Sequence, residues 1–247
     1  MRNILRKAAA VAAGAVFLFS AYKLGSYFLQ TRHAEQTRKS LEIYRPSPVS
    51  SRTEEATSSV QEEFSEILRL RDINPDAVAW LTVDGTNIDY PVVRGEDNEF
   101  YLTHDIYGEE LPSGTIFLDF RNRADFSDGV NILYGHQFKS GIMFEDVRRF
   151  RKEDFFDSHT SGTLTSANRQ YRLTTRAFLI VPSDSPLYGV DFGSSTLSDD
   201  FRKFITDHAS FLCEEGLDGA ERLLLLSTCT YEFKDARAVL VMSMSEA

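Results

Sequence analysis

Hydrophobic and polar positions divide the chain into an apolar N-terminal segment, a polar connection and a long region of short apolar runs. Residues 8–29 are mostly apolar and contain one charged residue, Lys23. Residues 30–59 are polar, with two prolines and a serine-rich patch, which is typical of a linker, although residues 34–44 allow a helix. From residue 60 onward the pattern predicts one folded domain that extends to residue 247.

Within this domain, the apolar residues first recur at helical and then at strand spacing. The pattern predicts an amphipathic helix over residues 60–70, packed on the domain. Short apolar runs bounded by turn residues then predict strands at 79–83, 88–93, 115–119, 130–134, 162–167 and 171–181. A second amphipathic helix is expected over residues 197–212. Many short strands with few helices favour an all-β barrel.

The last part of the chain predicts a pair of strands joined by a polar loop. Four leucines, Leu223–Leu226, suit a strand buried on both faces, although periodicity alone leaves a buried helix open. The polar loop 230–236 and the apolar run after it indicate a turn and a returning strand. If these strands form a hairpin, Cys229 at the end of one and Arg237 at the start of the next lie side by side.

A thiol beside a cation is a candidate nucleophile, because only the thiolate reacts and a nearby cation or imidazolium lowers the thiol pKa. The best candidate for the imidazole is His136, which follows a short apolar strand and Gly135. The other histidines, His33, His104, His159 and His208, lack this setting. From the residues alone, a structural thiol, a strand-end arginine in a salt bridge and a core histidine all stay open.

Composition narrows the possible functions. The formal net charge of −10 argues against a polyanion-binding surface, so nucleic acid is not an expected partner. Two cysteines exclude a disulfide scaffold and a four-thiolate zinc site. A Cys213–Cys229 disulfide would silence the proposed nucleophile and is not expected in the active form. No histidine or acidic spacing indicates a metal site, and the cluster of Asp119, Asp125 and Asp128 suggests a solvated loop.

The N-terminal segment predicts a membrane location. Arg2, Arg6 and Lys7 precede the apolar residues, which places the N-terminus in the cytoplasm by the positive-inside rule. We expect a cytoplasmic tail over 1–7, an uncleaved transmembrane signal anchor over 8–29 and an extracellular stalk over 30–59. A cleaved signal peptide is the alternative, because the uninterrupted apolar part is short for a membrane span.

The combination of Tyr134-Gly135-His136, Ser227-Thr228-Cys229 and Arg237 resembles the sortases. Longer segments between residues 62 and 247 are similar to class B sortases in particular. These segments are Ile88–Val93, Asp97–Asn98, Tyr101–Leu102, Gly114–Asp119 and Met143–Phe144. The resemblance implies a mainly β fold, an eight-stranded sortase-type β-barrel with N-terminal helices and an inserted helix before the penultimate strand.

The resemblance also implies a function. Class B sortases are membrane-anchored cysteine transpeptidases on the outer face of Gram-positive cells. They cleave a C-terminal sorting signal of secreted proteins after threonine and transfer the protein to an amine, without a cofactor. The amine belongs to a peptidoglycan precursor or cross-bridge, or to a pilin lysine. Here Cys229 matches the nucleophile, His136 the general acid and base, and Arg237 the residue that stabilises the oxyanion.

Substrate contacts are carried over in the same way. The residues expected to line the substrate groove are Asn98, Leu102, Tyr134, Tyr188 and Ser227. The loop 182–195, rich in serine, glycine and proline, is long enough to form one wall or a lid. Two other functions stay open at this point: a cysteine peptidase that uses water to resolve the acyl-enzyme, and an inactive surface-binding module.

Overall fold

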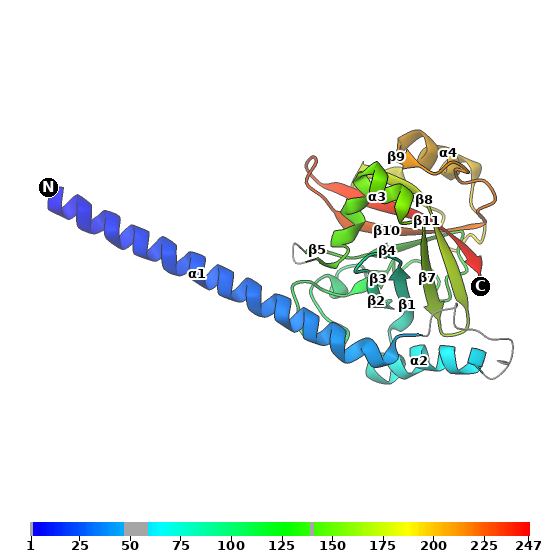
Figure 1. Cartoon of the computed structure of the whole chain (residues 1–247), viewed down its shortest axis with the longest axis horizontal. Coiled ribbons are helices and arrows are strands. Elements are labelled where there is room, and N and C mark those ends of the chain that lie inside the picture. The colour runs from blue at the N-terminus through cyan, green and yellow to red at the C-terminus, as the bar shows by residue number, and fades with distance from the viewer. Residues whose placement is uncertain (1, 47–58, 139–140) are drawn as a thin grey trace.

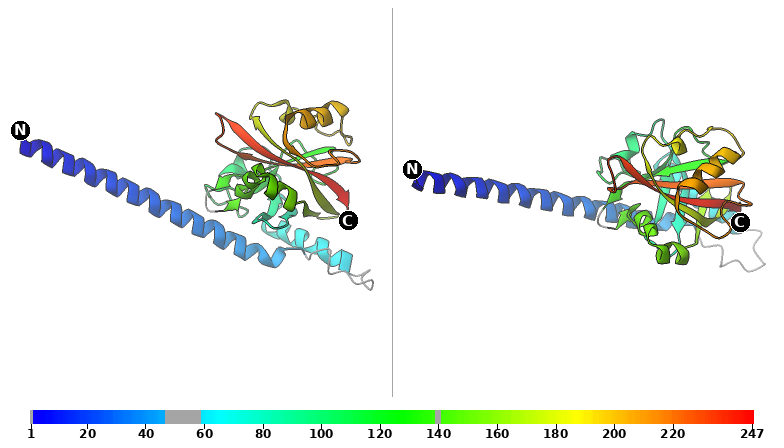
Figure 2. Two further views of the ribbon diagram at one scale, coloured as in Figure 1. Left: turned by 45° about the horizontal axis from the view of Figure 1, so that its top comes forward. Right: turned by 90° about the horizontal axis from the view of Figure 1, so that it is seen from above.

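The structure is a computed structural model that describes residues 2–46, 59–138 and 141–247 (Figure 1). Its longest element is α1 (Arg2–Leu41), a continuous helix that projects from the domain in every view (Figures 1 and 2). Residues Ala12–Tyr44 include a segment long and apolar enough to cross a membrane by length and composition. Residues 47–58 of the expected stalk lie outside the described residues.

A second helix, α2 (Ser59–Ile73), follows where the sequence predicts one, and it packs against the first strand. Ile67 and Leu70 are fully buried, whereas Leu68 is half exposed. Among the described side chains of this helix, Ile67 and Leu70 therefore face the domain, whereas Leu68 does not.

Eight strands of the described chain close into a barrel, as the family resemblance implies. They pair in the order β11-β10-β4-β3-β2-β1-β7-β8, and β8 pairs again with β11 to close the ring. The bounds are β1 (Ala77–Val83), β2 (Asp89–Val93), β3 (Ile116–Leu118), β4 (Val130–Tyr134), β7 (Ser161–Ser166), β8 (Gln170–Pro182), β10 (Arg222–Cys229) and β11 (Ala236–Glu246).

Short elements decorate this barrel. A small hairpin of β5 (Gln137–Phe138) and β6 (Ile142–Met143) follows β4. The remaining helical elements of the described residues are η1 (Glu42–Tyr44), η3 (Phe100–Leu102), η4 (Glu145–Arg151), α3 (Glu153–Ser158), η5 (Pro186–Tyr188) and α4 (Asp199–His208).

The leucine run in β10 lies between β11 and β4 and is buried on both faces. All four side chains of Leu223–Leu226 are fully buried. Leu224 and Leu226 join one hydrophobic cluster, whereas Leu223 and Leu225 join a second cluster that includes Ile205 of α4. This alternation is that of a strand, so the helical alternative for this segment is wrong.

The inserted helix before the penultimate strand is present but shorter than predicted. α4 begins after Ser198, whose hydroxyl accepts a hydrogen bond from the Phe201 amide at 3.3 Å, and it ends at His208. Residues 209–212 form a strand instead, β9 (Ala209–Leu212), which pairs with β8 outside the closed ring. The helical spacing of Phe211 is misleading, because pairing with β8 overrides the local pattern.

Candidate functional site

The hairpin of β10 and β11 brings Cys229 and Arg237 together. The two residues are directly paired in the antiparallel register, and the Thr230 amide donates to the Ala236 carbonyl at 3.0 Å just beyond them. Both Cys229 and Cys213 are free thiols. The sequence-predicted hairpin is confirmed, and a thiol and a guanidinium lie at the same end of the barrel.

The segment that carries His136 is tied to the segment that carries Cys229. β4 and β10 are parallel neighbours, with Tyr134 opposite Ser227. Beyond the strands, the Gly135 amide donates to the Ser227 carbonyl at 3.2 Å. The Thr228 hydroxyl donates to the Gly135 carbonyl at 2.7 Å. These bonds fix where the chain leaves the sheet, and His136 is the next residue.

Gly135 is required by close packing rather than by its backbone angle. A Cβ at this position would lie 2.8 Å from Cδ2 of Phe144 and would also overlap Cδ1 of Ile116. Only glycine lets the chain pass between these two buried side chains and present His136 at the rim of the barrel.

His136 is held by a backbone carbonyl. Its Nε2 lies 2.8 Å from the Leu102 carbonyl oxygen, at the end of η3. Because a carbonyl only accepts hydrogen bonds, Nε2 carries a proton in this arrangement. The sequence pattern gave no signal for this contact, because the acceptor belongs to the backbone and Leu102 was expected only as a substrate contact.

One groove of about 260 Å³ contains all eight residues that the sequence indicated. It is lined by Asn98, Leu102, Phe117, Tyr134, Gly135, His136, Ser183, Tyr188, Ser227, Thr228, Cys229 and Arg237. The loop after β8 forms part of the wall through Ser183 and Tyr188.

Arg237 has no acidic partner among the described residues. Its Nη1 contacts the carbonyl oxygens of Ala236 at 3.1 Å and Asp235 at 3.4 Å, both in its own turn. A guanidinium offers five donors, so the side chain keeps hydrogen-bonding capacity for a group in the groove.

Two tyrosines line the groove as neutral side chains. The Tyr188 hydroxyl lies 2.8 Å from the hydroxyl of buried Ser227, and its ring stacks on Tyr134 with 6.3 Å between the ring centroids. Burial raises the pKa of Tyr188 to about 12. Tyr188 therefore stays protonated at neutral pH.

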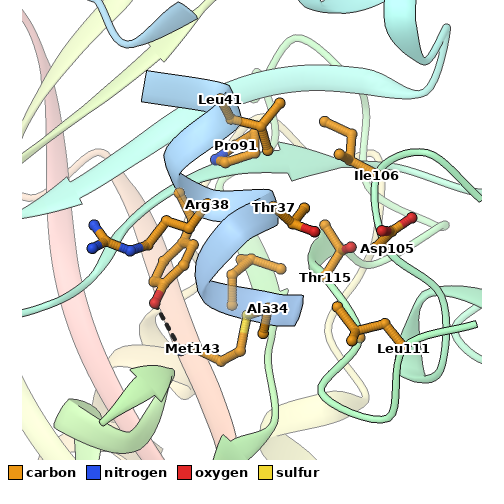
Figure 3. A pocket seen from close by; sticks show the side chains of 13 residues that line it. Ala34, Thr37, Arg38, Leu41, Pro91, Asp105, Ile106, Leu111, Thr115 and Met143 are labelled. Atoms are coloured by element: carbon orange, nitrogen blue, oxygen red, sulfur yellow. Dashed lines mark hydrogen bonds between the residues drawn. The ribbon is translucent and has the colours of Figure 1, made fainter. Parts of the chain in front are cut away.

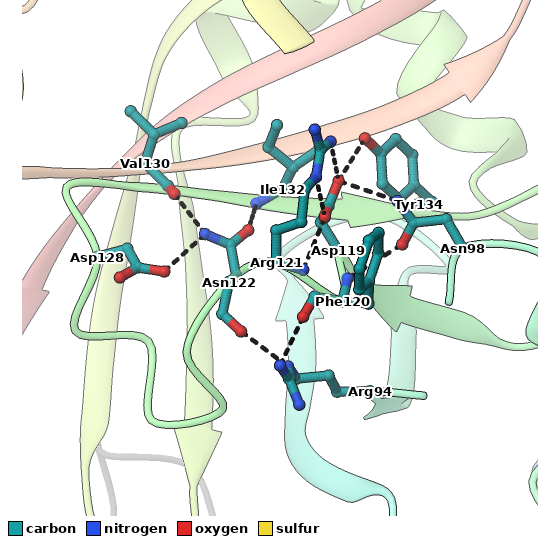
Figure 4. Close-up of polar contacts among 10 residues, drawn as sticks. All are labelled: Arg94, Asn98, Asp119, Phe120, Arg121, Asn122, Asp128, Val130, Ile132 and Tyr134. Atoms are coloured by element: carbon teal, nitrogen blue, oxygen red, sulfur yellow. Dashed lines mark hydrogen bonds and ion pairs between the residues drawn. The ribbon is translucent and has the colours of Figure 1, made fainter. Parts of the chain in front are cut away.

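Behind the groove, Asp119 collects hydrogen bonds from three side chains (Figure 4). Its carboxylate is fully buried and accepts from Arg121 at 2.7 and 2.9 Å, from the Tyr134 hydroxyl at 3.0 Å and from the Asn98 amide at 3.1 Å. Asn98 in turn accepts from the Phe120 amide at 3.0 Å. Two groove residues, Tyr134 and Asn98, are thus oriented by one carboxylate.

The electrostatics of Asp119 follow from these contacts. Burial raises the pKa of its carboxyl, but the hydrogen bonds and charge of Arg121 outweigh burial and hold the pKa below its ordinary value. Burial, followed by the Asp119 charge, raises the pKa of Tyr134. The pair is therefore an ionised carboxylate bound to a neutral phenol.

The interpretation of residues 121–128 as a solvated loop is wrong for Asn122 and Asp128, whereas Arg121 and Arg123 are exposed as expected. Asp128 is buried and accepts from the Asn122 side chain and the Arg123 amide, each at 2.8 Å. Asn122 is also buried and donates to the Val130 carbonyl at 2.7 Å (Figure 4). Only Asp125 of the expected acidic cluster is exposed. Hydrogen bonds within the loop and to the start of β4 hold Asn122 and one carboxylate oxygen of Asp128.

The other candidate residues lie outside the groove. Three of the remaining histidines stack on phenylalanine rings, and His33 lies near Asp105. Cys213 follows β9, and its thiol donates to the Gly216 carbonyl at 3.3 Å. Neither these four histidines nor Cys213 lines the groove.

Comparison with known proteins gives a consistent result. The chain is 31% identical to Sortase B of Listeria monocytogenes over 94% of this chain and 92% of that protein. Its structure is similar to a mutant form of Clostridium perfringens sortase B, with 29% identity, a TM-score of 0.71, and coverage of 87% of this chain and 98% of that one. No protein-family model matches the chain.

A third similarity concerns a complex. The Staphylococcus aureus sortase B-substrate complex is 25% identical, with a TM-score of 0.67 and coverage of 76% of this chain and 94% of that one. All three relatives match across most of their own length.

Proposed function

The chain belongs to the class B sortases, which are cysteine transpeptidases, and on this premise we propose that it joins exported proteins to an amine of the cell wall. The observation that supports this proposal most strongly is the single groove that contains a thiol, an imidazole and a guanidinium. The similarity to a sortase B solved with its substrate supports a substrate of the same class, a sorting-signal peptide.

In the proposed first step, the Cys229 thiolate attacks the carbonyl carbon of a threonine in the sorting signal. A C–S bond forms while the oxygen becomes an oxyanion, which Arg237 stabilises by donated hydrogen bonds. The C–N bond then breaks, and the leaving amine takes a proton from His136. Because the Leu102 carbonyl engages Nε2, Nδ1 is the nitrogen that exchanges this proton.

In the second step, an amine of a peptidoglycan precursor or cross-bridge attacks the thioester. A C–N bond forms, the C–S bond breaks, and His136 accepts the proton that the amine loses. Asn98, Leu102, Tyr134, Tyr188 and Ser227 are proposed to bind the peptide, because their side chains line the groove beside Cys229. No step requires a cofactor.

We also propose that the apolar part of α1 anchors the enzyme in the membrane with the barrel outside the cell. The segment is long and apolar enough to span a bilayer, and the basic residues Arg2, Arg6 and Lys7 precede it. The groove would then act on proteins that have crossed the membrane.

Incubation of the full chain in detergent with a threonine-containing peptide library tests this function. Mass spectrometry should detect an acyl adduct on Cys229, and an added peptidoglycan-type amine should convert the adduct into a new amide product. If excess amine yields only hydrolysed peptide, transfer is wrong and the enzyme is a peptidase. An adduct on Cys213 instead would show that the nucleophile is misassigned.

A further inference from the structure

The end of α1 nearest the domain packs on the barrel through one helical face. Ala34, Thr37, Arg38 and Leu41, at helical spacing, line this contact, and Ala34 and Leu41 are almost completely buried (Figure 3). His33 immediately precedes this face, and its side chain is 46% exposed. It therefore borders the contact without being covered by it.

Asp105 faces this end of α1 from the loop after η3 (Figure 3). Its Oδ1 accepts hydrogen bonds from the amides of Tyr107 at 2.9 Å and Glu109 at 3.0 Å. Its side chain is only 2% exposed, yet Oδ2 is buried and has no hydrogen bond to any residue that the structure describes. A buried carboxylate oxygen normally has a donor or a cation, so Oδ2 is free to accept a ligand.

The groups around Oδ2 are of the kinds that bind metal ions. His33 Nε2 lies 3.9 Å from Oδ2, too far for a hydrogen bond. Ligand atoms of His33, Asp105 and Glu109 all lie within 4.8 Å of one another. The side chains of His33 and Glu109 have exposed surface and can close around an ion, whereas Asp105 is fixed by its loop.

We propose that His33, Asp105 and Glu109 bind a divalent transition-metal ion, with Zn²⁺ as the preferred one, and that this ion fastens α1 to the domain. One imidazole and two carboxylates are a zinc donor set, because Ca²⁺ and Mg²⁺ prefer oxygen ligands alone. Water completes the coordination. His33 is far from the other two residues in the sequence, so spacing alone gave no indication of this site.

The site lies on α1 and the loop after η3, outside the groove, and its role is structural. A bond between helix and loop fixes the direction in which α1 leaves the barrel. If α1 is the proposed membrane anchor, the ion also sets how the groove is held relative to the membrane surface. Zinc binding itself does not depend on the proposed anchor or on the proposed reaction.

Calorimetric titration of the metal-free full chain in detergent with Zn²⁺ tests the site. All variants carry Cys229→Ala, which removes the groove thiol as a competing ligand. One equivalent is expected to bind. Loss of a partner of a metal ligand typically weakens binding about 10–100-fold, so His33→Ala and Asp105→Asn should each weaken it at least about tenfold. His208→Ala, an exposed histidine on α4, is the matched control and should bind normally.

A second measurement separates metal binding from misfolding. In the Cys229→Ala background, Zn²⁺ should slow amide hydrogen exchange in residues 30–44 of the protein without further changes and of His208→Ala. It should not slow this exchange in His33→Ala. In Asp105→Asn, the remaining Oδ1 can still accept the two loop amides. If this variant fails to fold, exposed Glu109→Gln replaces it.

Three results would overturn the proposal. The first is that no zinc binds, as a simple His33–Asp105 ion pair predicts. The others are an unchanged zinc affinity in His33→Ala, and zinc binding that leaves the amide exchange of residues 30–44 unchanged. Since none of these measurements involves peptide transfer, failure of the metal site and failure of the proposed enzymatic function are distinguishable.

Discussion

Two polar regions lie side by side at one end of the barrel and are built in opposite ways. Both carboxylate oxygens of buried Asp119 accept hydrogen bonds, and the positive charge of Arg121 balances the negative charge of the carboxylate. In the groove, Cys229 is a free thiol, Arg237 contacts only carbonyls of its own turn, and His136 is held by the Leu102 carbonyl. Neither Cys229 nor Arg237 forms an ion pair with a described residue.

The difference in hydrogen bonding indicates different roles for the two regions, a structural role for the Asp119 network and a chemical role for the groove. A fully satisfied buried network is rigid, because breaking any bond leaves a polar group without water. Groups without strong partners keep their hydrogen bonds for the substrate, where interactions that strengthen in the transition state accelerate the reaction. Tyr134 belongs to both regions, since its hydroxyl binds Asp119 and its side chain lines the groove. The Asp119 region is therefore expected to control stability and the groove to control rate.

The largest effect is expected from removal of the proposed nucleophile. Cys229→Ala should lower the rate of peptide transfer on the order of 10⁴-fold or more, because no thioester can form. The free energy of unfolding should change by less than about 1 kcal/mol, since the thiol is only half-buried. Fluorogenic peptide assays and urea unfolding measure the two quantities.

Cys213→Ser is the matched control for this variant. A serine hydroxyl can replace the thiol that donates to Gly216, and Cys213 lies outside the groove. Near-normal transfer by this variant is expected. Transfer by Cys229→Ala above a thousandth of the wild-type rate would contradict the assignment of Cys229.

Arg237→Lys should have the next largest effect. Lysine keeps the charge but loses the planar fork of donors, and loss of an oxyanion donor typically lowers kcat about 10²–10³-fold. KM should change little, because the lost bonds form mainly in the transition state. Steady-state kinetics compared with Arg172→Lys, an exposed arginine on β8, checks this. A kcat within twofold of wild type would remove Arg237 from the proposed mechanism.

The two regions also differ in how far the sequence could predict them. Cys229, His136 and Arg237 each follow or begin an apolar strand, so the strand pattern already placed them at a rim, and the family resemblance joined them. The partners of Asp119 come from separate segments around residues 98, 121 and 134. A loop rich in aspartate and arginine is typical of solvent exposure, and only tertiary packing determines that Asp119 and Asp128 are buried. The early end of α4 is also determined by tertiary structure, because the local sequence does not reveal that the residues after it pair with β8.

Asp119→Asn should reduce stability more than it alters the chemical step. The amide nitrogen cannot accept the bonds from Arg121 and Tyr134, and we expect a loss of about 2 kcal/mol in the free energy of unfolding, moderated because Arg121 is 38% exposed. KM should rise as Asn98 and Tyr134 lose their common partner, while kcat falls less than in Arg237→Lys.

The pH dependence of this loss follows from the lowered pKa of Asp119. A carboxyl with a lower pKa in the folded state contributes its full stabilisation above its ordinary pKa and loses it as the pH falls through the folded-state pKa. The difference between wild type and Asp119→Asn should therefore be constant at neutral pH and shrink below about pH 4. Urea unfolding from pH 3 to 7 measures it, with exposed Asp218→Asn as the control. A difference that persists unchanged at pH 3 would mean that the charge of Asp119 is not responsible.

The smallest effect is expected for Tyr188→Phe, which removes a neutral hydrogen bond from the groove. Ser227 is buried and loses the hydroxyl 2.8 Å away, whereas the ring can still stack on Tyr134. The expected loss in the free energy of unfolding is about 1 kcal/mol.

Because the pKa of Tyr188 is raised to about 12, the stabilisation by its hydroxyl is complete below the ordinary tyrosine pKa and fades only at higher pH. The loss should thus be constant from pH 5 to 9, and a double-mutant cycle with Ser227→Ala should recover most of it as coupling between the two hydroxyls. Absence of coupling would mean that the bond between Tyr188 and Ser227 does not stabilise the groove wall. The structural hydrogen bonds would then be confined to the Asp119 region.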